Sequence, residues 1–258
     1  MDQPIQTSNA GRPILHTRWV RISHWLITLG FLTLAYTGVM ILMVHPRLYW
    51  GEVGNDLTKP IVELPISRNY QHNGWQSKGV VFLDNAGLIS SNRTYDIFNQ
   101  NGWGRSLHFL AGWVLVTTGL PYLLFGIISG HFRRNLLPSR AQISQSSIRL
   151  EIQNHLRFRI PRANGGPAYG FLQKSTYVGV IFIGLPMMFI TGIAMAPAVT
   201  AAFPFLLDVF GGYQSARTIH FLSFIVLVVF LIMHIVMIIA SGFRAQMRGM
   251  TLGVKHEE

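Results

Sequence analysis

The chain has 258 residues, of which 50% are hydrophobic and only 12% are charged. Soluble domains normally carry about 25% charged residues, so this composition excludes an ordinary water-soluble domain and indicates that lipid surrounds much of the chain. The formal net charge is +11 and there is no cysteine, which excludes disulfides, iron–sulfur clusters, covalently attached haem and thiolate metal sites.

Four apolar stretches are long enough to span a bilayer, which takes roughly 20 residues. They cover residues 19–44, 106–130, 171–196 and 218–241. Pro186 lies inside the third stretch and predicts a kink there, because proline removes a backbone hydrogen bond. The chain length fits one compact unit. The sequence therefore predicts an all-α fold, an integral membrane four-helix bundle formed as a single domain over residues 1–258.

Three loops connect these stretches. The first, 45–105, is long and rich in glycine, asparagine, tryptophan and tyrosine, and the second, 131–170, is basic. The third, 197–217, contains an apolar piece at 198–210 that is too short to span. We expect this piece to lie at the membrane interface or to cap the bundle. No internal repeat is evident in the sequence.

The charged residues are distributed unevenly along the chain. The two tails and the second loop, with the span ends beside them, hold fourteen Lys or Arg and four Asp or Glu residues, whereas the first and third loops hold seven and six. Because cytoplasmic segments carry the excess of Lys and Arg, both termini are predicted to be cytoplasmic and loop 45–105 periplasmic. Topology and contact with anionic lipid explain the basic charge, so no nucleic-acid binding is expected.

The four spans contain no Asp or Glu, but they contain four histidines. These are His24, His108, His220 and His234. Ion pumps and proton-coupled transporters usually need an intramembrane carboxylate, so this composition disfavours transport. His220 and His234 are 14 residues apart, which is about 40° short of four full helical turns and about 21 Å along the axis. Both therefore lie on one helix face, near opposite membrane surfaces.

Depth in the membrane assigns a partner to each of these histidines. His24 begins the first span and lies near the cytoplasmic side, like His234, whereas His108 and His220 each begin a span at the periplasmic side. Haem iron takes imidazole as an axial ligand, and helix bundles build cofactor sites from facing helices. The sequence therefore predicts two haem b groups, held by His24 with His234 and by His108 with His220. The alternative interpretation is a set of core or pore histidines.

Three of the histidines follow an arginine by three residues. The arginines are Arg21, Arg105 and Arg217, before His24, His108 and His220. Residues three apart share a helix face, and arginine pairs well with carboxylates. We interpret these arginines as candidate cofactor-binding residues that pair with haem propionates. The alternative is that they anchor helix ends at the membrane surface.

The arrangement of these residues resembles the di-haem cytochrome b561 superfamily. The resemblance rests on His24-Trp25, on His108 at the head of the second span, and on His220 with His234. This superfamily includes the membrane cytochrome b subunits of formate dehydrogenase, nickel–iron hydrogenase and thiosulfate reductase. The segment 45–70, with Tyr49-Trp50-Gly51 and Glu63-Leu64-Pro65, is similar to the thiosulfate-reductase group in particular.

The resemblance covers the helical core and implies that the four matching histidines are axial ligands of haem b iron. It also implies the bacterial inner membrane, exchange with the quinone pool, and a periplasmic redox partner that is often a molybdenum enzyme. We therefore expect the electron-transfer subunit of an oxidoreductase complex, rather than a complete enzyme, with quinone or quinol as exchangeable substrate and a molybdopterin-containing partner.

Two other functions are also compatible with the sequence. A stand-alone superoxide:quinone oxidoreductase is reasonable because the resemblance extends to shorter family members. A positive outer vestibule would steer superoxide, however, and the segments expected outside are nearly neutral. A histidine-lined metal transporter is the third possibility, and it predicts purified protein without haem absorbance.

Overall fold

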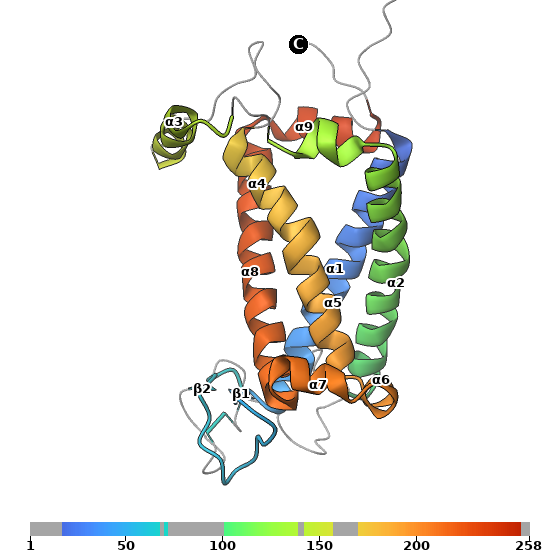
Figure 1. Cartoon of the computed structure of the whole chain (residues 1–258), viewed down its shortest axis with the longest axis vertical. Coiled ribbons are helices and arrows are strands. Elements are labelled where there is room, and N and C mark those ends of the chain that lie inside the picture. The colour runs from blue at the N-terminus through green and yellow to red at the C-terminus, as the bar shows by residue number, and fades with distance from the viewer. Residues whose placement is uncertain (1–16, 68–69, 72–100, 139–141, 157–169, 254–258) are drawn as a thin grey trace, which may run out of the picture.

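The computed structural model describes residues 17–67, 70–71, 101–138, 142–156 and 170–253. Four long helical rods run side by side (Figure 1). They are α1 (Arg18–Val44), α2 (Asn101–Ile128), α4 (Phe171–Gly179) with α5 (Leu185–Ala194), and α8 (Tyr213–Ala240). Each rod is long and apolar enough to cross a membrane. This confirms the predicted helical architecture with four candidate spans.

The third rod is irregular near the predicted position. Between α4 and α5 lies a π-helical turn, η3 (Val180–Gly184), which ends two residues before Pro186. Proline is tolerated in the first turn of a helix, where its missing N–H costs no hydrogen bond. The expected distortion therefore takes the form of a π turn that accommodates one extra residue. A second proline, Pro121, lies inside α2.

Short helices lie at the two ends of the bundle. α6 (Pro197–Ala202) and α7 (Phe205–Phe210) cover one end, and α9 (Phe243–Thr251) lies at the other (Figure 1). The apolar piece in the third loop therefore forms a cap of two short helices. The piece remains at the end of the bundle because it is too short to span the membrane.

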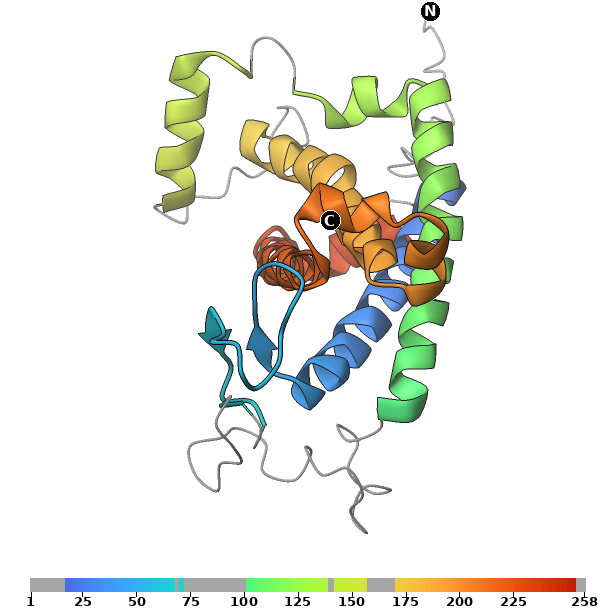
Figure 2. The same cartoon turned by 60° about the horizontal axis from the view of Figure 1, so that its bottom comes forward.

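The second loop contains the π turn η2 (Phe132–Leu136) and helix α3 (Gln145–Leu156). α3 stands away from the bundle on the side of α9 (Figures 1 and 2). It is tied to the third rod by Glu151, whose carboxylate accepts hydrogen bonds from the backbone N–H groups of Phe171 (2.7 Å) and Leu172 (3.1 Å). A carboxylate at a helix N-terminus satisfies free N–H groups and complements the helix dipole.

The start of α1 and the end of the chain meet at the same end of the bundle. Arg21 Nη1 donates to the Thr251 carbonyl (2.6 Å), and Trp25 Nε1 donates to the Met250 carbonyl (3.3 Å). We call this the α9 end. At the opposite end, strands β1 (Arg47–Leu48) and β2 (Val62–Glu63) pair antiparallel, with Arg47 opposite Glu63, so we call it the hairpin end. The side of the membrane to which each end belongs stays a prediction.

Loop 45–67 at the hairpin end is bound to the start of α8. Thr218 Oγ1 donates to the Tyr49 carbonyl (2.6 Å), and Gly51 N–H donates to Ser215 Oγ (2.8 Å). Gly212, just before α8, has φ +117°, and a Cβ there would lie 2.5 Å from the carbonyl carbon of Gly51. The loop can approach α8 this closely because residue 212 is glycine.

The helices associate as two pairs. Within the described residues, α1 packs along α2 and α5 packs against α8, whereas contacts between the two pairs are sparse. No more than 22% of the most apolar window of any span is buried. The helix faces therefore remain largely exposed, as expected for spans that lipid surrounds.

Candidate functional site

Two pairs of imidazole rings lie where the helix pairs face each other. The ring centroids of His24 on α1 and His234 on α8 are 6.3 Å apart, with the ring planes at 49°. The centroids of His108 on α2 and His220 on α8 are 6.4 Å apart, with the planes at 58°. The structure thus brings together the same pairs that membrane depth indicates, at two heights along α8. Their role as iron ligands stays a prediction.

The separations within the two pairs fit a metal ion between each pair of rings. A metal–imidazole nitrogen bond is about 2 Å long, and the ring centre lies about 1 Å further on, so two trans imidazoles have centres about 6 Å apart. In the parts of the chain that the structure describes, no group of three or more histidine or acidic side chains could hold a metal ion. Two facing imidazoles suit iron whose other positions a macrocycle fills.

Threonine hydroxyls contact both rings of the pair nearer the hairpin end. Thr37 Oγ1 on α1 lies 2.9 Å from His108 Nδ1, and Thr191 Oγ1 on α5 lies 2.9 Å from His220 Nδ1. Both threonines are fully buried. Neither threonine is among the site residues predicted from the sequence. The signal that could have found them is the Thr-Gly dipeptide present in both spans.

The pair nearer the α9 end lies among aromatic rings. Phe230 stacks on the His234 ring at a centroid distance of 5.7 Å, and Tyr177 meets it edge-on at 6.0 Å. Trp25 contacts the His24 ring edge-on at 5.3 Å. The two histidine pairs therefore have different surroundings, one with hydroxyl contacts and one rich in aromatic rings.

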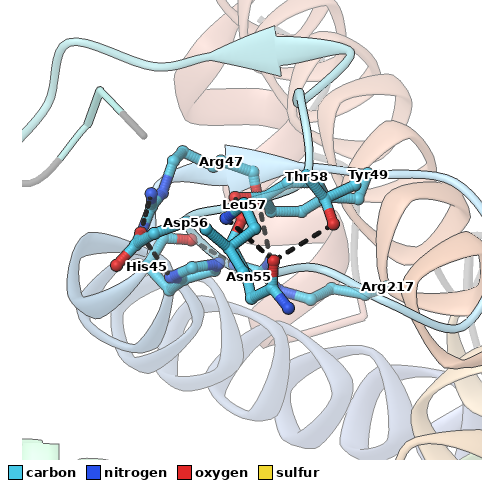
Figure 3. A network of polar contacts seen from close by, with 8 residues as sticks. All are labelled: His45, Arg47, Tyr49, Asn55, Asp56, Leu57, Thr58 and Arg217. Atoms are coloured by element: carbon cyan, nitrogen blue, oxygen red, sulfur yellow. Dashed lines mark hydrogen bonds and ion pairs between the residues drawn. The ribbon is translucent and has the colours of Figure 1, made fainter. Parts of the chain in front are cut away.

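The three arginines of the sequence pattern have three different environments. Arg21 donates to the Thr251 carbonyl at the α9 end. Arg217 is inserted under loop 45–67, where its guanidinium donates to the carbonyl oxygens of Arg47 (2.8 Å) and His45 (Figure 3). Arg105 is exposed at the start of α2. Their pairing with haem propionates stays a prediction.

The two helix pairs carry corresponding residues. Arg105 and His108 on α2 match Arg217 and His220 on α8, and Thr37-Gly38 on α1 matches Thr191-Gly192 on α5. A Cβ at either glycine would lie 3.5 Å from Cε1 of the histidine that the neighbouring threonine contacts. The same local arrangement is thus built twice.

The two helix pairs no longer carry matching residues at the α9 end. Fourteen residues after His108 stands Tyr122, where α8 has His234. Thirteen residues before Thr37 stands His24, and fourteen before Thr191 stands Tyr177. The extra residue of η3 accounts for this difference in spacing. Each helix pair therefore supplies one histidine and one tyrosine at this level.

A polar cluster lies at the hairpin end and comprises His45, Arg47, Tyr49 and Asp56 (Figure 3). Arg47 forms an ion pair with Asp56 and donates from Nη2 to His45 Nδ1 (3.1 Å). The His45 and Tyr49 rings stack at a centroid distance of 5.7 Å. Burial, followed by the positive charges of Arg217 and Arg47, lowers the pKa of His45 from 6.5 to about 4, against an opposing effect of Asp56. His45 is therefore neutral near pH 7.

The hairpin end is expected to lose stability in mild acid. Because His45 takes up a proton at pH 6.5 when unfolded but only near pH 4 when folded, the free energy of unfolding falls as the pH drops below 6.5 and levels off under about 4. Thermal unfolding in detergent between pH 7.5 and 4.5 measures this. His45→Asn keeps an acceptor for Arg47 but does not titrate, so it should show a weaker pH dependence. An equal dependence in both proteins would contradict the assignment.

Comparison with known proteins gives one family and one relative. The profile of the family described as Prokaryotic cytochrome b561 matches residues 15–253. The protein of Azospira oryzae named "Putative protein-methionine-sulfoxide reductase subunit YedZ1" is 25% identical over 224 residues, which cover 87% of this chain and 89% of the relative. No solved structure matches the chain. The family match includes all four helical rods and the four histidines.

Proposed function

The chain belongs to the prokaryotic cytochrome b561 family, and on that premise we propose that it carries electrons between the quinone pool and a periplasmic redox partner. The family establishes the coarser statement, a membrane electron-transfer protein that binds haem b. The finer proposal is that two haem b groups are bound, with quinone or quinol as the exchangeable substrate.

The observation that carries this proposal is the pair of facing imidazoles at each of two heights along α8. His24 with His234, and His108 with His220, have ring centres 6.3 and 6.4 Å apart, the separation of axial ligands on one iron ion. Between two imidazoles, haem b would supply one-electron chemistry that needs no substrate at the iron. His220 and His234, about 21 Å apart along one helix, would hold the two groups near opposite membrane surfaces.

The orientation of the protein in the membrane follows from the distribution of its basic residues. The tails and the second loop hold most of the basic residues, and α9 meets the start of α1. We therefore assign the α9 end to the cytoplasm and the hairpin end to the periplasm of a bacterial inner membrane. Residues 68–69 and 72–100 of the proposed periplasmic loop lie outside the described part of the chain.

A subunit role is supported by the relative in Azospira oryzae, which is named as a reductase subunit. We propose a molybdopterin-containing oxidoreductase as the periplasmic partner. For the propionates, Arg105 is the first candidate, because its side chain is exposed whereas Arg21 and Arg217 already donate to backbone carbonyls.

Purified protein and a soluble quinol test the proposal directly. We expect Soret and α-band absorbance of bis-histidine haem b, and reduction of both groups when quinol is added without oxygen. A colourless preparation from haem-replete cells, or bands that quinol leaves unchanged, would refute it. Fast reduction by superoxide, with electrons passing to quinone without any partner, would instead favour the stand-alone oxidoreductase.

A further inference from the structure

Each threonine at the hairpin-end histidine pair has two close polar neighbours and a third, more distant one, which is the carbonyl oxygen three residues before it (Leu34, 3.3 Å; Met188, 3.2 Å). Thr37 Oγ1 lies 2.7 Å from the Thr33 carbonyl oxygen and 2.9 Å from His108 Nδ1. Thr191 Oγ1 lies 2.6 Å from the Met187 carbonyl oxygen and 2.9 Å from His220 Nδ1. All four close contacts are within hydrogen-bonding distance.

The number of available protons determines which group donates in each of these hydrogen bonds. A hydroxyl has one proton, and a carbonyl oxygen can only accept. The short contact to the carbonyl therefore takes the hydroxyl proton, as in the usual back-bonding of threonine to residue i−4 in a helix. The remaining contact requires the imidazole Nδ1 to donate to the hydroxyl oxygen. Both rings therefore carry their proton on Nδ1.

A neutral imidazole protonated on Nδ1 has its lone pair on Nε2. That nitrogen is then free to bind a metal ion, and a hydrogen bond from Nδ1–H fixes the ring orientation and makes the ring a stronger electron donor. Resting on the haem binding proposed above, we propose that Thr37 and Thr191 are positioning residues that hold His108 and His220 with Nε2 ready to bind haem iron and tune the potential of that haem.

The glycines beside the threonines support this role. At Gly38 and Gly192 a Cβ would lie 3.5 Å from the ring carbon Cε1 of His108 and His220, respectively. A side chain larger than alanine would press on the ring. Each ring thus has a hydroxyl at Nδ1 and, at the next residue along the chain, a glycine that leaves room for it.

The other histidine pair provides an internal comparison. The described contacts of the His234 ring include the aromatic rings of Phe230 and Tyr177, and the threonine contacts belong to the hairpin-end pair. A change in Thr37 or Thr191 should therefore affect one haem and leave the other as it was. A general loss of stability would affect both.

Thr37→Val and Thr191→Val test the inference, because valine keeps the shape and removes the hydroxyl. Without the hydrogen bond each histidine becomes a weaker donor, so ferric iron is less stabilised. At a fixed ambient potential, the reduced-to-oxidised ratio of one haem should rise by about two- to tenfold, and that of the other should not change. Spectropotentiometric titration of purified protein measures both.

Matched controls are available on the same rods. Thr33 and Thr176 back-bond to carbonyls in the same way (Leu29, 2.9 Å; Leu172, 2.7 Å), and Thr33→Val and Thr176→Val should leave both titrations unchanged. Thr37→Ser and Thr191→Ser keep the hydroxyl and should restore the wild-type value, even where valine lowers haem content.

The outcomes separate this inference from the function on which it rests. Wild-type protein without haem would refute the function. Wild-type protein with two haem groups, but with valine variants that titrate like the controls, would refute the positioning role alone. Serine variants that behave like valine variants would also refute it, because the methyl group and not the hydroxyl would then matter.

Discussion

Replacing His234 with alanine is expected to remove the haem at the α9 end and to leave the other haem in place, and His220→Ala is expected to do the reverse. Each substitution deletes one of the two proposed ligands of a haem and leaves only the facing ring, His24 or His108, whose centroid lies 6.3 or 6.4 Å from that of the removed imidazole. Pyridine haemochrome analysis of purified protein should show half the wild-type haem content in each variant.

Combining substitutions tests the pairing itself. His108→Ala with His220→Ala should lose no more haem than either alone, because both act on one site, whereas His108→Ala with His234→Ala should lose all of it. His45→Ala is the matched control, since His45 is a membrane-proximal histidine outside both pairs, and it should retain both haem groups. Retention of full haem content in His220→Ala or His234→Ala would end the bis-histidine assignment.

Removing the guanidinium of Arg217 is expected to have the second large effect, on stability. In Arg217→Met the carbonyl oxygens of His45 and Arg47 lose charged donors at a half-buried position. Hydrogen bonds to charged groups and the cost of leaving such acceptors unpaired predict a loss of about 2–5 kcal/mol. Thermal or denaturant unfolding in detergent should show it, with loop 45–67 becoming accessible to protease first.

Arg105→Met provides the control, because Arg105 holds the corresponding position on α2 but is exposed. Its unfolding free energy should stay within about 0.5 kcal/mol of wild type. Equal losses in the two variants would show that the carbonyl contacts of Arg217 contribute nothing particular. If Arg105 pairs with a propionate, its variant should shift one haem potential without a change in stability.

The sequence predicts the spans and the placement of the histidines because both depend on simple geometry. Lipid requires long apolar helices, and 3.6 residues per turn place His220 and His234 on one face. Because successive spans cross the membrane in opposite directions, His24 lies at the same depth as His234, and His108 lies at the same depth as His220. These steps need no knowledge of side-chain packing.

The environments of the arginines could not be predicted in this way. Arg21, Arg105 and Arg217 share a spacing, but their partners depend on how loop 45–67 and α9 fold over the helix ends. Loop 45–67 reaches Arg217 through tertiary contacts, among them the close approach at Gly212. A common local pattern therefore leads to three different environments.

The relation between the two helix pairs is also hidden in the sequence. The contacts of Thr37 with His108 and of Thr191 with His220 connect residues 71 and 29 positions apart, so the shared Thr-Gly dipeptide marks the threonines but does not reveal which histidines they contact. The added residue in η3 shifts the register between α4 and α5, and tyrosine replaces histidine at Tyr122 and Tyr177. The repeat becomes visible only when the helices are placed in space.

The sparse packing between the two helix pairs has a consequence for biogenesis. Each pair can enter the bilayer as an antiparallel unit. The pairs are then joined at their ends, by the bonds of loop 45–67 to α8 and by those of Arg21 and Trp25 to the end of the chain. Haem bound by histidines of both helix pairs would then hold the two pairs together. An apoprotein made under haem starvation would accordingly be loosely packed between the two ends of the bundle and would be a substrate for membrane quality-control proteases.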